Sequence, residues 1–231
     1  MITRLEDPSA LNAEVVGAKA AALALARRGD LPVLPGFVID ASASRGHLAL
    51  GSSQLAVRGS GGARLTVSAE PIPGAEQIEA AGRGLSSLLV ARSSSPMEGD
   101  GKWAGAFTSY IGITPEELPK AVAGCWASTF SVDALDRQRR AGIEPGSVPM
   151  AVLVQPAIDA VAGGVAEITP EGTVRVEAVA GTPAALLRGW ERGAAAIRRL
   201  GEKWEGAEAI ALIGEETLQV LGATMDAASR R

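Results

Sequence analysis

The chain has 231 residues, enough to bury a core in one domain or in two closely packed lobes. Its charged fraction is 21% and its net charge is −4, with no long basic tract, so nucleic acid is excluded as an expected partner. The single cysteine, Cys125, excludes an intrachain disulfide, and no apolar run has the length of a signal peptide or a membrane span. We therefore expect a cytoplasmic protein that does not enter a membrane.

The first part of the chain predicts a helix and a strand. Residues 9–28 place apolar side chains at helical spacing, and we predict that this helix starts near Gly17 and ends at Gly29. A short strand is predicted at 37–39. Residues 41–84 carry a weaker pattern, which favours a hairpin around residues 60–62 and then a helix that begins at Glu76.

The second part predicts a more definite mixture of elements. Thr114, Pro115 and Glu117 form a capping signature for a helix that runs on through "CWASTF". We then predict an apolar strand at 150–155, two strands joined by a Pro-Glu-Gly turn, a helix from 184 to 203, and a closing hairpin that turns at 214–216. Because helices and strands intermingle without regular alternation, we predict an α+β fold with two lobes, of about residues 1–145 and 146–231.

The corner "VARSSS" is the strongest candidate for a binding site. Arg92 follows an apolar strand directly and precedes three serines, an unusual place for a solvated arginine. Its alternative role is a structural ion pair with Glu98 or Asp100. By their pattern alone, Lys19 is a solvated helix residue, His47 a surface residue, and Cys125 with Trp126 part of a helix core.

Several motifs resemble one family in order and spacing. "VVGAKAAAL" is similar to its VGGKGASL-type segment, "VLPGFVID" to PPGFVIT, "VARSSS" to VRSSAT, "WAGA" to FAGQ, "CWASTF" to CWASLF and "AVLVQ" to AVVVQ. This family is the nucleotide-binding domain of pyruvate phosphate dikinase, phosphoenolpyruvate synthase and rifampin phosphotransferase. The resemblance implies an ATP-grasp-like fold, shortened here, without the phosphohistidine and phosphoenolpyruvate/pyruvate domains.

The resemblance also implies a set of ATP-binding residues. Lys19 and Arg92 match the two cations that meet the phosphates. Gly105 and Ser109 fall on the small-residue phosphate loop, and Gln155 lies at the end of the strand that meets the adenine. ATP with Mg²⁺ is the ligand that this family uses, because phosphoryl transfer depends on cations placed around the phosphates.

The chain departs from the family where the chemistry needs further side chains. The second lobe of the family ends in two strands whose Glu, Gln and Arg hold magnesium and the transferring phosphate. Their apolar pattern places Ile210, Gly222 and Thr224 at these positions. A rival register offers Glu208 and Gln219 but still lacks the arginine, and Ala106 replaces the glutamine of the phosphate loop.

Two functions follow as hypotheses. The first is a degenerate nucleotide-binding domain, a pseudoenzyme that performs little phosphotransfer and serves as a binding or accessory protein with a partner protein or a small-molecule ligand. The alternative is a divergent ATP-dependent phosphotransferase subunit that works with a separate phosphohistidine or substrate-bearing chain. Arginines 188, 192 and 199, on one face of the helix predicted at 184–203, would suit an acidic partner.

Overall fold

The structure is a computed structural model that describes residues 2–100, 102–103, 105–187, 189–199 and 202–229. The chain divides into two compact units, residues 1–157 and residues 158–231. Among the described residues, no helix is long and apolar enough to cross a membrane.

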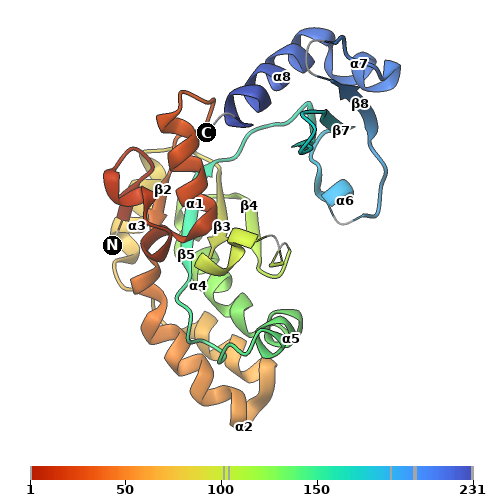
Figure 1. The fold of residues 1–231 in the computed structure, drawn as a ribbon. Helices are drawn as coiled ribbons and strands as arrows, with labels where there is room; N and C mark the ends of the chain where they lie inside the picture. Colours follow the sequence, from red (N-terminus) through yellow and green to blue (C-terminus); the bar gives the residue numbers. More distant parts are fainter. Residues whose placement is uncertain (1, 101, 104, 188, 200–201, 230–231) are drawn as a thin grey trace. The chain divides into compact units, whose positions relative to one another are not determined.

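The first unit contains a five-stranded sheet in the order β1-β2-β5-β3-β4, in which all neighbouring strands are antiparallel (Figure 1). Its strands are β1 (Ile2–Arg4), β2 (Phe37–Ile39), β3 (Leu89–Ser94), β4 (Ser109–Ile113) and β5 (Ala151–Pro156). The run Ala151–Gln155 is buried throughout. A central strand that is covered on both faces needs such a continuous apolar run, which explains why the sequence predicts it clearly.

Helices lie on both faces of this sheet (Figure 1), and each face carries an apolar cluster. On one face, α1 (Ala13–Arg28) packs through Val16, Ala20 and Ala24 against Val38 and Leu153. The other face receives α2 (Arg45–Ala69), α3 (Ala75–Arg83) and α4 (Leu118–Ala127), with α5 (Val132–Arg140) following. Because α1 supplies mostly alanines, its backbone lies close to the strands.

Short 3₁₀ segments join the elements of this unit. They are η1 (Pro8–Leu11), η2 (Ala41–Ser44), η3 (Pro96–Asp100), η4 (Pro115–Glu117) and η5 (Ser128–Phe130). The capping box that the sequence predicts forms at η4, where Thr114 and Glu117 exchange hydrogen bonds between side chain and backbone before α4 begins.

The second unit is a smaller sheet with helices. Strands β6 (Ala162–Ile168), β7 (Val174–Ala180) and β8 (Ala194–Arg198) form an antiparallel sheet in that order. The helices are α6 (Ala184–Leu187), α7 (Ala207–Ile213) and α8 (Glu215–Ser229). Val174, Val176 and Ala196 of the sheet share a core with Ala209 of α7 and Leu218 of α8.

The structure mixes helices and strands, which confirms the prediction that the fold contains both. Strands at 37–39 and along 150–155 are confirmed, as are the helix that ends at Gly29 and the two strands joined by a turn at 169–172. These elements carry complete local signals, in the form of an apolar run, a cap or a turn.

The hairpin predicted around residues 60–62 is wrong, because residues 45–69 form α2. The glycines that suggested a turn lie inside this helix, and only Gly59, at φ +64°, breaks the helical backbone. Ala63 and Val67 face the core one helical turn apart, a spacing that outweighs the glycines. His47 lies on the same helix and is 4% exposed, so its prediction as a surface residue is wrong as well.

Two predictions for the second unit are also wrong. The helix predicted at 184–203 is only α6, because residues 194–198 pair with β7 and Gly193 donates its backbone N–H to the Glu177 carboxylate at 2.9 Å. The closing hairpin is instead the helix pair α7 and α8, broken at Gly214 (φ +82°). Leu218, Leu221 and Met225 recur at the helical period, which the strand interpretation overlooked.

Candidate functional site

The helix α1 changes direction at Gly17, where it meets the end of β3. Gly17 has φ +77° and ψ 161°, which a residue with a side chain rarely adopts. Beyond it, the Ala18 N–H donates to the carbonyl oxygen of Ser95 at 3.1 Å, and the Ala20 N–H donates to Ser94 Oγ at 3.1 Å. The start of this helical segment is therefore held against the serine run by direct hydrogen bonds.

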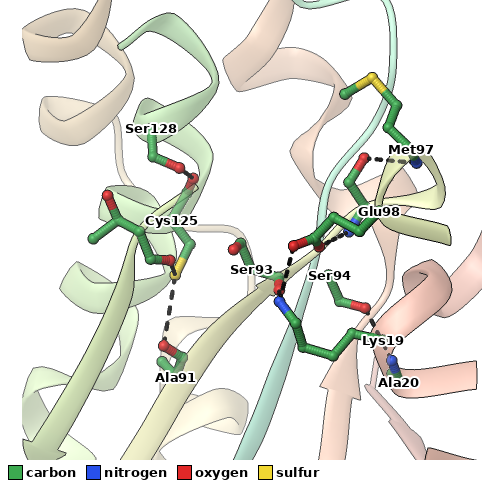
Figure 2. A network of polar contacts seen from close by, with 11 residues as sticks. Lys19, Ala20, Ala91, Ser93, Ser94, Met97, Glu98, Cys125 and Ser128 are labelled. Atoms are coloured by element: carbon green, nitrogen blue, oxygen red, sulfur yellow. Dashed lines mark hydrogen bonds and ion pairs between the residues drawn. The ribbon is translucent and has the colours of Figure 1, made fainter. Parts of the chain in front are cut away.

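Lys19 lies between the serine run and an acidic side chain. Its Nζ donates to the carbonyl oxygen of Ser93 at 2.5 Å and to Glu98 Oε1 at 3.0 Å (Figure 2). The other carboxylate oxygen of Glu98 accepts the backbone N–H of Ser95 at 2.9 Å. The prediction that Lys19 is merely solvated is wrong, because its ammonium group is half-buried and bound to two partners.

Arg92 stands beside this network on β3, and its side chain has no partner among the residues that the structure describes. Within the described part of the chain, no hydrogen bond or ion pair joins its guanidinium to another residue. The carboxylate of Glu98 pairs with Lys19, so the alternative that Glu98 pairs with Arg92 is wrong. The side chain of Asp100, the other alternative partner, lies outside the described residues.

Burial affects the Arg92 guanidinium directly. Its partial burial lowers its pKa from the ordinary value, and the negative charge of Glu98 opposes this effect. Arginine stays protonated in any case, so the result is a half-buried positive charge without a paired anion. Such a charge is costly to maintain without a partner, which makes it a candidate for binding one.

The sheet register brings two further predicted residues to the face of Arg92. Arg92 pairs with Ser109 of β4 and with Leu153 of β5, and Val90 pairs with Gln155. Alternate residues of a strand share a face, so Arg92, Ser109 and Gln155 lie on one side of three adjacent strands. Ser109 is exposed, whereas Gln155 is 6% exposed and donates from its Nε2 to the Leu34 carbonyl oxygen at 3.1 Å.

Gly105 lies in the connection between η3 and β4. Its φ is +71°, and a β-carbon there would meet no atom within 4 Å. The glycine is therefore needed for its backbone conformation and not for close packing. Trp103 and Phe107 stack with ring centroids 5.9 Å apart, and Ala106 between them is buried. No hydrogen bond joins Gly105 to Lys19 or Arg92 among the described residues.

Cys125 and Trp126 are core residues of α4, as predicted. Burial raises the pKa of the Cys125 thiol to about 12, the nearby Lys19 opposing this only in part. The thiol is thus protonated and unsuited to act as a nucleophile. His47 packs against Trp126 with ring centroids 4.7 Å apart, and its buried Nε2 has no hydrogen-bond partner in the described part of the chain.

The residues assigned to the family's second-lobe strands lie on helices. Ile210 is on α7 and Thr224 on α8, and the Thr224 hydroxyl donates to the Val220 carbonyl oxygen. The carbonyl of Gly222 accepts from Arg198 at 3.2 Å. Glu208 and Gln219, the rival pair, are likewise helical. The alignment of this segment with a catalytic hairpin is therefore wrong.

Sequence reasoning missed the serine backbone and the role of Glu98. The carbonyl oxygens of Ser93 and Ser95 and the hydroxyl of Ser94 all bind α1. A signal was present, because a glycine before Ala18-Lys19 allows close approach and a serine run offers polar groups to it. The carboxylate at position 98 was weighed only as a partner for Arg92.

A half-buried arginine, a tethered lysine and small polar residues on one sheet face define a candidate anion-binding domain. Residues 71–189 match the family model described as pyruvate phosphate dikinase, AMP/ATP-binding domain, slightly more than half of the chain. The chain belongs to this family, and its membership supports a nucleotide-binding domain. No curated protein matches the chain. The matched segment contains four of the predicted site residues, Arg92, Gly105, Ser109 and Gln155, and Lys19 precedes it.

The resemblance implies a magnesium ion, which needs oxygen ligands near the phosphate site. The described residues contain no group of three or more His, Cys, Asp or Glu side chains that could hold a metal. Mg²⁺ is commonly bound through one or two carboxylates together with substrate phosphates. Glu98, whose negative charge acts on Arg92, is already bound to Lys19 and to the Ser95 N–H. These residues do not fit a dedicated magnesium site.

Proposed function

We propose that this protein is a degenerate nucleotide-binding domain that binds the phosphate end of a nucleotide at Arg92 and performs little phosphotransfer itself. It would act as a binding or accessory protein, in a two-lobed ATP-grasp-like arrangement of about residues 1–145 and 146–231. The observation that carries this proposal is the half-buried Arg92 guanidinium, which has no partner among the described residues.

Arg92 supplies the charge in this proposal. A guanidinium presents several N–H donors that suit phosphate oxygens, and partial burial strengthens each of these contacts. Ser109 stands beside it in the register and offers a hydroxyl, while Gln155 completes the same face. Lys19 would add a second cation only if its bond to Glu98 were given up. The nucleotide, with any magnesium ion bound to its phosphates, would enter from solution. The protein would supply only the groups that bind it, since the ligand itself carries the reactive phosphoryl group.

A thermal-shift experiment tests this proposal. ATP at about a hundred times its dissociation constant should stabilise the folded state by about 3 kcal/mol and raise the melting temperature by several degrees. Arg92→Ala should abolish the shift. Arg139→Ala, which removes an exposed arginine from α5, should keep it. A protein that shows no shift with either ATP or AMP at millimolar concentration would contradict the proposal.

A second candidate is a divergent phosphotransferase subunit that works with a separate phosphohistidine or substrate-bearing chain. The match to a pyruvate phosphate dikinase domain favours it, because the matched segment contains Arg92, which resembles a phosphate-binding arginine of the family. ATP-dependent phosphorylation of a partner chain or a small molecule by the purified protein, lost in Arg92→Ala, would establish this function. Binding of ATP without turnover in the same assay would support the accessory role.

A further inference from the structure

We propose that Glu98 is an internal counter-ion that limits how much phosphate charge the Arg92 face accepts, so that the site takes a nucleotide with one phosphate in preference to a triphosphate. This inference rests on the proposed function, because it concerns the ligand of the same site. It assigns to Glu98 a role in ligand selection that does not require contact with the nucleotide's base or sugar.

Glu98 holds Lys19 through a well-anchored carboxylate. One oxygen accepts from Lys19 Nζ at 3.0 Å and the other from the Ser95 N–H at 2.9 Å, so both oxygens are engaged (Figure 2). The side chain of Glu98 is 12% exposed and that of Lys19 is 26% exposed. The pair is therefore largely shielded from water, and its charges interact more strongly than an exposed pair would.

The three described side chains of this group, Lys19, Glu98 and Arg92, together carry the net charge of a single cation. Lys19 and Glu98 neutralise one another, which leaves Arg92 as the cation of this group without an ion pair among the described residues. A nucleoside monophosphate carries about two negative charges at neutral pH, and a triphosphate carries more. One free guanidinium matches a single phosphate group better than a chain of three.

A second phosphate that bound Lys19 would lie next to the Glu98 carboxylate, which is 3.0 Å from the ammonium group. Like charges brought together cost binding free energy, and Glu98 could withdraw only by breaking its bond to the Ser95 N–H. Lys19 is also fixed by its 2.5 Å bond to the Ser93 carbonyl oxygen, which would have to break before the ammonium group could follow a ligand. Glu98 and Ser93 thus keep the lysine away from additional phosphates.

Isothermal titration calorimetry with AMP and with ATP tests the inference. The buffer holds a chelator and low salt, so that the nucleotides keep their full charge. The wild-type protein should bind AMP at least as tightly as ATP. Glu98→Gln retains a hydrogen-bond acceptor for Ser95 but removes the charge, and it should raise the affinity for ATP about tenfold and that for AMP about threefold or less.

The matched control is Glu116→Gln. Glu116 also lies 3.0 Å from a cation, Arg83, but is exposed, so its removal should change both affinities by less than about twofold. The affinities for inorganic tripolyphosphate and for inorganic phosphate are then compared in the same way. These ligands lack adenosine, so they separate the effect of phosphate charge from that of contacts with the nucleoside.

Three outcomes contradict the inference. They are tighter binding of ATP than of AMP by the wild-type protein, an equal change for both nucleotides in Glu98→Gln, and an equal effect of Glu116→Gln. The wild-type comparison needs no variant, so a folding defect in Glu98→Gln leaves the inference testable. If the wild-type protein binds neither nucleotide, the proposed function fails together with this inference, whereas binding with an unchanged ratio overturns this inference alone.

Discussion

Gly17 of α1 lies against Ser94 of β3 so closely that a β-carbon on the glycine would overlap the carbonyl group and the hydroxyl of the serine. This contact places Lys19 beside the end of β3, two residues further along the helix. The local position of the lysine therefore depends on a residue without a side chain.

Gly17→Ala should destabilise the first unit strongly. The substitution adds a β-carbon at φ +77° and forces it into backbone atoms that cannot rotate away, for a loss of about 3 kcal/mol in the free energy of unfolding. Urea denaturation measures this loss. Gly61→Ala is the matched control, because Gly61 is helical with open space around it, and we expect a gain of about 0.5–1 kcal/mol. Equal effects at both positions would show that the Ser94 contact is unimportant.

The secondary structure around Arg92 was predictable from the sequence, but the contacts between the side chains of the candidate site were not. The apolar strand before Arg92 and the capped helix near Thr114 carry local signals, so they were predicted correctly. Which of Lys19 and Arg92 binds Glu98 depends on how α1 packs on β3, a contact between residues more than seventy positions apart. No periodicity or motif encodes such a choice.

The second unit shows a different error, in which a strand pattern was preferred to a helical one. Residues 207–223 were predicted as a hairpin that turns at 214–216. The apolar side chains at 218, 221 and 225 have helical spacing, and the structure follows that spacing. In residues 194–198, alanines that favour a helix form a strand because β7 offers a partner edge, so tertiary pairing overrides propensity.

The Lys19–Glu98 pair should show a measurable coupling free energy. Its side chains are largely shielded, so a double-mutant cycle of Lys19→Met and Glu98→Gln should give a coupling of about 1–2 kcal/mol. Single variants and the double variant are compared by urea denaturation. The exposed pair of Arg83 and Glu116 serves as reference and should show a much smaller coupling, because solvent screens its charges. A coupling no larger than the reference value would mean that the pair contributes only as a surface contact does.

Cys125 should make the stability of the first unit depend on alkaline pH. Its pKa is raised from 9.0 to about 12 in the folded state, so the folded protein keeps a proton that the unfolded chain loses. The stabilisation is fully present below about pH 9 and is lost as the pH rises toward 12, by at most about 1.4 kcal/mol per pH unit.

The measurement compares the wild type with Cys125→Ala between pH 8 and about pH 11. Other groups titrate in this range, so only the difference between the two unfolding free energies is used. This difference should be largest near pH 8 and should decrease as the pH rises. A constant difference would mean that the thiol ionises equally in both states.

Asp226 should stabilise the second unit through Arg198. Both Asp226 oxygens accept from Arg198 Nη2, at 2.7 and 2.8 Å, and the guanidinium also lies 5.4 Å from the Trp204 ring centroid. The Arg198 side chain is 12% exposed, so Asp226→Ala leaves a buried charge without this carboxylate and should cost about 3 kcal/mol. Hydrogen exchange of the α8 and β8 amides measures the loss, which should be confined to residues 158–229.

Two further variants separate the ion pair from general effects of charge. Glu167→Ala breaks an exposed contact with Arg175 of 3.7 Å in the same unit and should change protection by less than about 0.5 kcal/mol. The double variant Arg198→Met with Asp226→Leu replaces the buried pair with apolar side chains of similar size and should recover most of the loss, because neither charge then lacks a partner. If the double variant stays as unstable as Asp226→Ala, the loss comes from altered packing of α8 and not from an unpaired charge.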